Sequence, residues 1–205
     1  MQFASRTERI APFYVMEMAK TAQALAREAA HTRQEMIFDK ENGPDFAAPP
    51  LVTEAAERAI RDGRTQYTNA LGLEALREAL SRWYGERFGL DGPARRILIT
   101  AGASAALHLA CLALINAGDE ILMSDPGYPC NRHFVAAAEG VPVLIPTSAE
   151  ERYQLSHAKV GAAWGARTRG VLLASPSNPT GTSIAPEELR AIHEVVRARG
   201  GLTLI

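Results

Sequence analysis

Several residue types are scarce in this sequence of 205 residues, and each scarcity excludes a class of protein. Only two cysteines occur, Cys111 and Cys130, which are too few for a disulfide framework and fit a reducing, cytoplasmic compartment. The five histidines lie far apart and none shows ligand spacing, so we expect no metal site. No apolar run reaches the roughly 18 residues of a membrane span, and the first six residues do not resemble a signal peptide.

Charge of one sign is also lacking, because the formal net charge is only -1. This balance argues against a nucleic-acid-binding or membrane-binding surface, although a local patch stays possible. Apolar residues make up 47% of the chain, enough for a sizeable core. Only three lysines are present, Lys20, Lys40 and Lys159, so the choice of a reactive amine is narrow.

Apolar periodicity predicts helices that alternate with short strands along most of the chain. The helices are expected over 10–30, 51–61, 73–88, 103–116, 130–139, 155–164 and 186–199, and the strands over 96–101, 120–124, 141–146, 170–174 and 202–205. Apolar strands separated by helices predict an α/β fold, a three-layer, mostly parallel sheet with helices on both faces. The proline-rich stretch 43–50 predicts a segment boundary. Pro186 and Gly200 are typical first and following residues of the last helix.

Two segments that each follow a predicted strand could bind a ligand. The stretch 101–105 has small side chains at the start of a helix, where free amides and the helix dipole favour an anion. Ser104 could add a hydroxyl, although small residues there also serve close packing. The turn Asp125-Pro126-Gly127-Tyr128-Pro129 places one aromatic ring at a strand end, where it could stack on a planar heterocycle or simply pack on the sheet.

Two further loops carry polar groups. In Ser175-Pro176-Ser177-Asn178-Pro179-Thr180-Gly181, prolines on both sides of Asn178 restrict the backbone that carries its amide, and either X-Pro bond is a candidate for the cis form. The stretch 65–73 is a loop with Tyr67, whose hydroxyl could bind a phosphate oxygen, while a solvated tyrosine is the commoner case.

Taken in order, these motifs resemble the class I/II aminotransferases of fold type I, which use pyridoxal phosphate. The similarity runs from about residue 10 to residue 205 and rests on a series of short segments: Tyr67-Thr68, Gly72, Leu76-Arg77, 102–107, 118–120, 125–129 and 175–181. The resemblance implies an enzyme that transfers an amino group between an amino acid and a 2-oxo acid. It also implies an N-terminal arm and small-domain segment over 1–47 and a large cofactor-binding domain over 48–205.

The resemblance also implies roles for individual residues. The backbone of Ala103 and Ser104 would hold the cofactor phosphate, Tyr128 would stack on the ring, and Asn178 would bond its phenolic oxygen. Tyr67 would reach the cofactor of a neighbouring subunit, so the site would need a homodimer. A segment with Asn42 and Gly43, and Asn178 itself, would contact the substrate; Asn42-Gly43 departs from the family's usual Gly-Glu, which puts those contacts in doubt.

The same resemblance implies residues that are not found. The Schiff-base lysine and the aspartate that bonds the ring nitrogen would follow residue 205, and none of the three lysines occupies the family position; each is read as a solvated surface charge. We therefore expect no catalytic residue and no transaminase turnover in this chain, which reads as the front part of a longer enzyme. The alternatives are an inactive fragment or non-catalytic partner of an aminotransferase, and a small complete domain that ends in the strand 202–205.

Overall fold

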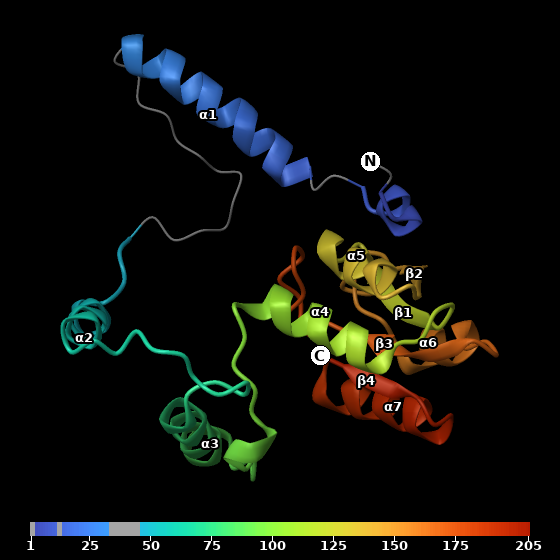
Figure 1. Cartoon of the computed structure of the whole chain (residues 1–205). Coiled ribbons are helices and arrows are strands. Elements are labelled where there is room, and N and C mark those ends of the chain that lie inside the picture. The colour runs from blue at the N-terminus through green and yellow to red at the C-terminus, as the bar shows by residue number, and fades with distance from the viewer. Residues whose placement is uncertain (1–2, 12–13, 33–45) are drawn as a thin grey trace. The chain divides into compact units, whose positions relative to one another are not determined.

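The computed structural model describes residues 3–11, 14–32 and 46–205 (Figure 1). The chain divides into two compact units, one of 1–13 with 102–205 and the other of 14–101. All strands of the described residues belong to the first unit, and the second contains helices and loops. The predicted boundary between 47 and 48 lies within the second unit's range and stays a prediction.

The first unit is built on a four-stranded parallel sheet with the order β2-β1-β3-β4. Its strands are β1 (Glu120–Asp125), β2 (Val141–Pro146), β3 (Thr168–Leu172) and β4 (Leu202–Leu204). The sequence therefore predicted the fold class correctly, an α/β fold with a parallel sheet. It placed β3 over 170–174, two residues later than the observed 168–172; just beyond the strand, Leu173 donates one further hydrogen bond to the carbonyl of Leu204.

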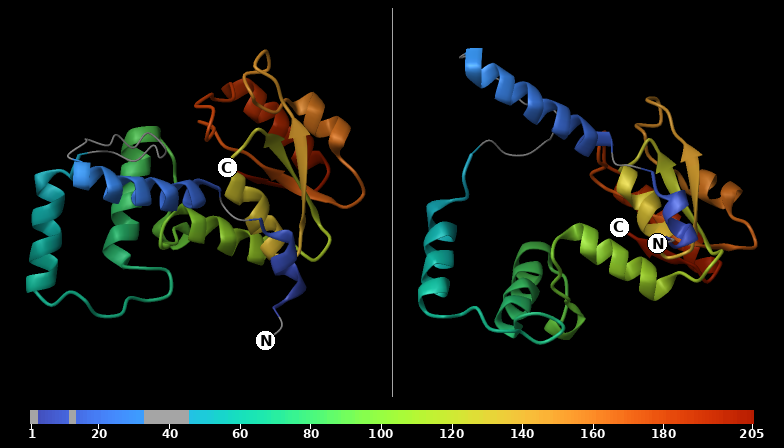
Figure 2. Two further views of the ribbon diagram at one scale, coloured as in Figure 1. Left: turned by 90° about the horizontal axis from the view of Figure 1, so that it is seen from above. Right: turned by 45° about the horizontal axis from the view of Figure 1, so that its top comes forward.

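Helices cover both faces of this sheet, as Figure 2 shows from two further directions. The helices are α4 (Ala103–Leu114), α5 (Pro129–Ala137), α6 (His157–Ala163) and α7 (Pro186–Ala198). Successive strand side chains point to opposite faces. Ile121 and Met123 accordingly pack in one buried cluster with residues of α4 and α5, while Leu122 packs in the other with residues of α6 and α7.

Local signals at the ends of α7 act as the sequence predicts. Pro186 occupies the first turn, where its missing N–H costs nothing, and Glu187 and Glu188 complement the helix dipole. Gly200 follows the helix with a φ of 66°, a conformation that glycine adopts without strain.

The second unit contains α1 (Tyr14–Thr32), α2 (Pro50–Arg61), α3 (Glu74–Phe88) and the 3-10 turn η2 (Ala94–Arg96); a further turn, η1 (Ser5–Arg9), lies in the first unit. Arg77 on α3 is buried, and its guanidinium donates to the carbonyl of Ala94 at 3.0 Å. Gly72 has a φ of 93°, and a Cβ there would lie 2.6 Å from that of Ile99. These contacts join α3 and its preceding loop to the segment after α3.

The strand predicted over 96–101 is wrong. Residues 94–96 form η2, and the following extended residues join no sheet among the described residues. Ile99 donates to the carbonyl of Leu71 at 3.0 Å, so this backbone pairs with a loop. An apolar run predicts extended backbone, but a strand also needs a neighbouring strand, which local sequence does not specify.

Candidate functional site

The site lies at the carboxyl ends of two neighbouring strands, β1 and β3, after which the chain runs in opposite directions along the sheet. After β1 the chain enters α5 on one face of the sheet and continues to β2, whereas after β3 it enters α7 on the other face and continues to β4. Between strands that diverge in this way, a crevice opens outside their carboxyl ends, and ligands of parallel α/β sheets bind there.

The N-terminus of α4 borders this crevice. Gly102 precedes the helix with φ 85° and ψ 170°, and Ala103 and Ser104 form the start of its first turn. The first amides of an α-helix have no partner within the helix, and the helix dipole adds a partial positive charge. This end of the crevice is therefore suited to an anionic group.

Tyr128 lies at the carboxyl end of β1, directly before α5. The Cys130 thiol raises the pKa of the Tyr128 phenol above its ordinary value, burial adds to the rise, and a hydrogen bond with Ser104 opposes it. The phenol is therefore neutral at physiological pH and is linked to the first turn of α4 through Ser104. Its ring forms part of the crevice wall.

Asn178 lies on a loop that is closed by its own backbone. Ser177 donates to the carbonyl of Thr182 and Gly181 donates to that of Ser177, both at 2.8 Å. The peptide bonds before Pro176 and Pro179 are both cis, within the alternatives that the sequence left open. The two backbone hydrogen bonds hold Asn178 at the carboxyl end of β3.

A hollow of about 600 Å³ joins these elements. Four residues singled out in the sequence line it: Ala103, Ser104, Tyr128 and Asn178. Its wall also includes the carboxyl end of β3 and the residue Ile205. The fold brings together side chains from three segments that are separated by up to 75 positions in the sequence, from 103 to 178.

The other predicted site residues are not in this hollow. Tyr67 belongs to the second unit, where its side chain is fully exposed beside a separate hollow of about 430 Å³. Asn42 and Gly43 lie outside the described residues. The roles of these three residues stay predictions.

Asn131 is a site residue that the sequence reasoning missed. It follows Tyr128 by three positions on the first turn of α5, and it lines both the large hollow and a smaller one beside it. Its side-chain oxygen is buried and has no hydrogen-bond partner among the described residues. The spacing of three residues, which puts two side chains on one helical face, was the available signal.

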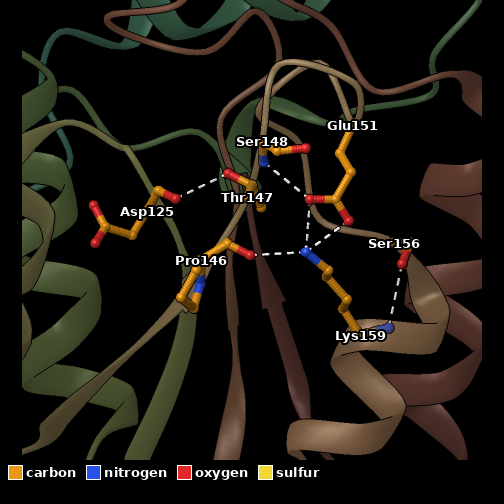
Figure 3. A network of polar contacts seen from close by, with 7 residues as sticks. All are labelled: Asp125, Pro146, Thr147, Ser148, Glu151, Ser156 and Lys159. Atoms are coloured by element: carbon orange, nitrogen blue, oxygen red, sulfur yellow. Dashed lines mark hydrogen bonds and ion pairs between the residues drawn. The ribbon is translucent and has the colours of Figure 1, made fainter.

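Lys159 is not the solvated charge that the sequence suggested. Figure 3 shows its ammonium between the Glu151 carboxylate, at 2.6 and 2.7 Å, and the carbonyl of Pro146, at 2.8 Å. Its side chain is one-third exposed. Lys20 is largely exposed and pairs with Glu17, while Lys40 lies outside the described residues. Neither described lysine lines the hollow.

Two other kinds of site are absent from the described ranges. No group of three or more histidine, cysteine or acidic side chains there could hold a metal ion. The helices of residues 3–11, 14–32 and 46–205 include none with the length and apolar character needed to cross a membrane.

The sequence of this chain is similar to that of known aminotransferases. It matches the family described as aminotransferase class I and II over residues 38–205. It is 38% identical over 192 residues to a valine–pyruvate aminotransferase of Mycobacterium tuberculosis, which covers 91% of this chain and 48% of that protein. It is 31% identical over 202 residues to an aspartate aminotransferase of Geobacillus stearothermophilus, covering 98% and 50% respectively.

Solved structures give the same result. An aminotransferase from Mycobacterium tuberculosis matches with a TM-score of 0.88 at 35% identity, covering 99% of this chain and 51% of that one. An aspartate aminotransferase from Thermus thermophilus with maleate matches with a TM-score of 0.92 at 28% identity, covering 99% and 52%. The chain spans about half the length of these relatives, and it belongs to the class I and II aminotransferase family.

Proposed function

We propose that this chain supplies the pyridoxal phosphate cradle of an enzyme that transfers an amino group between an amino acid and a 2-oxo acid. The observation that carries the proposal is the single hollow at the strand ends, which gathers Ser104, Tyr128 and Asn178. It unites an anion-binding helix end, an aromatic ring and an amide, the three kinds of group that a phosphorylated, planar heterocycle requires.

The residues present fit that cofactor. A hollow of about 600 Å³ is within the range of small-molecule sites. The buried oxygen of Asn131 is an acceptor that a donor bound in the crevice would satisfy, since buried polar atoms in proteins are normally paired. The phosphate would lie against the amides of Ala103 and Ser104.

Pyridoxal phosphate, when bound, supplies an electron-accepting ring and an aldehyde carbon that exchanges with substrate amino groups. The chain's own residues bind and orient it. Tyr128 offers its ring face for stacking, and the neighbouring Cys130 thiol raises the pKa of its phenol further above the ordinary value of 10.0. Asn178, fixed by its closed loop, donates a hydrogen bond to the phenolic oxygen.

Further features of the proposal follow from family membership. Tyr67 contacts the cofactor phosphate of a second subunit in a homodimer, and its full exposure in its own unit supports this. Asn42, Gly43 and Asn178 contact the substrate. The protein acts in the cytoplasm, as the scarcity of cysteine favours.

Binding of pyridoxal phosphate to the purified chain tests the cradle. We expect Tyr128→Ala to weaken binding roughly 2- to 13-fold, the equivalent of the 0.5–1.5 kcal/mol that aromatic stacking contributes. Tyr14→Ala, at an exposed position of α1, is the matched control and keeps the original affinity. Equal affinities of all three proteins would contradict the proposed site.

Borohydride reduction followed by intact mass determination tests the part played by lysine. We expect no specific cofactor adduct and no transamination by the 205-residue chain above the background of free cofactor. A nucleophilic lysine must be neutral, whereas the ammonium of Lys159 is held by a carboxylate. An adduct on Lys159, or product above background, would refute this expectation.

A further inference from the structure

One residue outside the hollow closes the loop that carries Asn178. The carbonyl of Thr182, which accepts the backbone bond from Ser177, also accepts a hydrogen bond of 2.7 Å from the side-chain nitrogen of Gln154. The same nitrogen lies 3.2 Å from the Thr182 hydroxyl. A carbonyl oxygen has two lone pairs, so it accepts from both Gln154 and Ser177, and Ser177 directly precedes Asn178.

The backbone before Gln154 is held in an unusual form. Arg152 and Tyr153 both have a φ of 54°, in the left-handed region that residues with side chains seldom adopt. This turn aims the carbonyl of Arg152 at the same loop, where it accepts a hydrogen bond of 2.6 Å from the Thr182 hydroxyl. Strain of this kind persists only where the surrounding structure holds it in place.

A polar network anchors the turn at its other side (Figure 3). Glu151 accepts a hydrogen bond of 2.9 Å from the backbone of Ser148 and pairs with Lys159 of α6. Lys159 also binds the carbonyl of Pro146 at the end of β2. Contacts therefore run without a break from the edge strand of the sheet, through the turn 148–154, to the loop of Asn178.

We propose that Gln154 is a positioning residue that fixes the Asn178 loop in the geometry needed to bind the phenolic oxygen of the cofactor. This inference rests on the proposed function for the identity of the ligand. Gln154 does not itself line the hollow; it acts through Thr182 and Ser177, and its side-chain nitrogen also lies 3.5 Å from the carbonyl of Ala174 in the hollow wall. By ordering the loop before binding, it removes an ordering cost that the cofactor would otherwise bear.

Amide hydrogen exchange tests the loop without any cofactor. In Gln154→Met, which keeps the length of the side chain and removes its donor, we expect the amides of Ser177 and Gly181 to exchange roughly fivefold faster, as for the loss of one neutral hydrogen bond. The amide of Leu122 in the central strand should not change. Gln23→Met, the same substitution at an exposed position of α1, should change none of these rates.

Measurements of cofactor binding then distinguish a positioning role of Gln154 from a general contribution to the stability of the fold. We expect Gln154→Met to weaken binding of pyridoxal phosphate roughly fivefold. It should leave unchanged the binding of an analogue that lacks the phenolic oxygen. In an Asn178→Ala background, the Gln154 substitution should have no further effect, because both residues act on the same contact.

Each outcome decides one of the two proposals. If the unmodified chain does not bind pyridoxal phosphate, the proposed function fails, and the exchange rates still decide the role of Gln154. Unchanged exchange at Ser177, or an equal loss of affinity for the cofactor and the analogue, would overturn the inference. Gln154→Glu, which also lacks a donor nitrogen, serves if the first variant does not fold; unfolding of both would show that Gln154 supports the whole unit rather than the loop.

Discussion

Replacement of Gly102 by alanine should damage the anion-binding end of the hollow without filling it. Gly102 has φ 85° and ψ 170°, a combination that is essentially restricted to glycine. A Cβ at this position would meet no atom within 4 Å, so the penalty is conformational and not steric. We expect the native backbone at this residue to become about 1–3 kcal/mol less favourable.

The variant can relieve this strain by rotating the backbone before α4. Rotation would turn the amides of Ala103 and Ser104 away from the bound phosphate. Binding must then restore the strained backbone conformation of residue 102. The affinity for pyridoxal phosphate should therefore fall by up to the about 1–3 kcal/mol of that strain, which corresponds to about 5- to 150-fold.

Equilibrium dialysis with pyridoxal phosphate measures this loss, and urea unfolding measures stability in parallel. Gly118 is the matched control, because its φ is 83°, a Cβ there would also meet no atom within 4 Å, and it lies beyond the other end of α4. Gly118→Ala should cost roughly 1–2 kcal/mol of stability and leave the affinity unchanged. Equal affinity in Gly102→Ala and the original chain, or equal losses in both variants, would refute the assignment of the helix end to the phosphate.

Three further substitutions have expected outcomes. Lys159 lowers the pKa of Glu151 below its ordinary 4.5, so the carboxylate stabilises the fold above pH 4.5 and this contribution is lost as the pH falls through the lowered pKa. Glu151→Gln should therefore reduce the loss of stability in acid, measured as the urea midpoint against pH. An unchanged profile would contradict the network. Cys130→Ala should lower the pKa of Tyr128 toward 10.0, as read by ultraviolet titration against a Tyr128→Phe blank, and no change would rule out the thiol as the main cause. Arg77→Met removes the charge-assisted hydrogen bond from the buried guanidinium to the carbonyl of Ala94, which keeps its bond from the backbone of Ile97, and should reduce the free energy of unfolding by about 1–3 kcal/mol; unaltered urea unfolding would show that this bond is dispensable.

Local sequence predicts much of the architecture because helix periodicity and helix ends depend on neighbours only a few residues away. The helices of the sheet unit begin and end within about two residues of the expected positions, and Pro186 and Gly200 delimit α7 as expected. The failed strand over 96–101 shows the limit of this approach. Its apolar residues favour extended backbone, but pairing needs a partner that the periodicity of one segment cannot identify.

In the candidate site too, local sequence predicts some residues, whereas others are recognisable only from contacts between distant segments. Ser104, Tyr128 and Asn178 were each recognisable from their own motifs, because a helix start, a turn aromatic and a proline-restricted amide are local features. Asn131 and Gln154 were not recognised. The burial of the Asn131 oxygen, which has no partner among the residues that the structure describes, and the bond from Gln154 to Thr182 exist only after separate segments meet.

The sequence by itself determined the alternation of helices and strands, the class of the fold and the chemical character of each loop, since these follow from short-range sterics and hydrophobic patterning. Only the tertiary structure decided that the loops after β1 and β3 face a single hollow, and that Lys159 is tied to Glu151 rather than free in solvent. The shared hollow depends on strand order. The order β2-β1-β3-β4 makes the chain diverge between two neighbouring strands, and long-range packing of both sheet faces, not any single segment, sets that order.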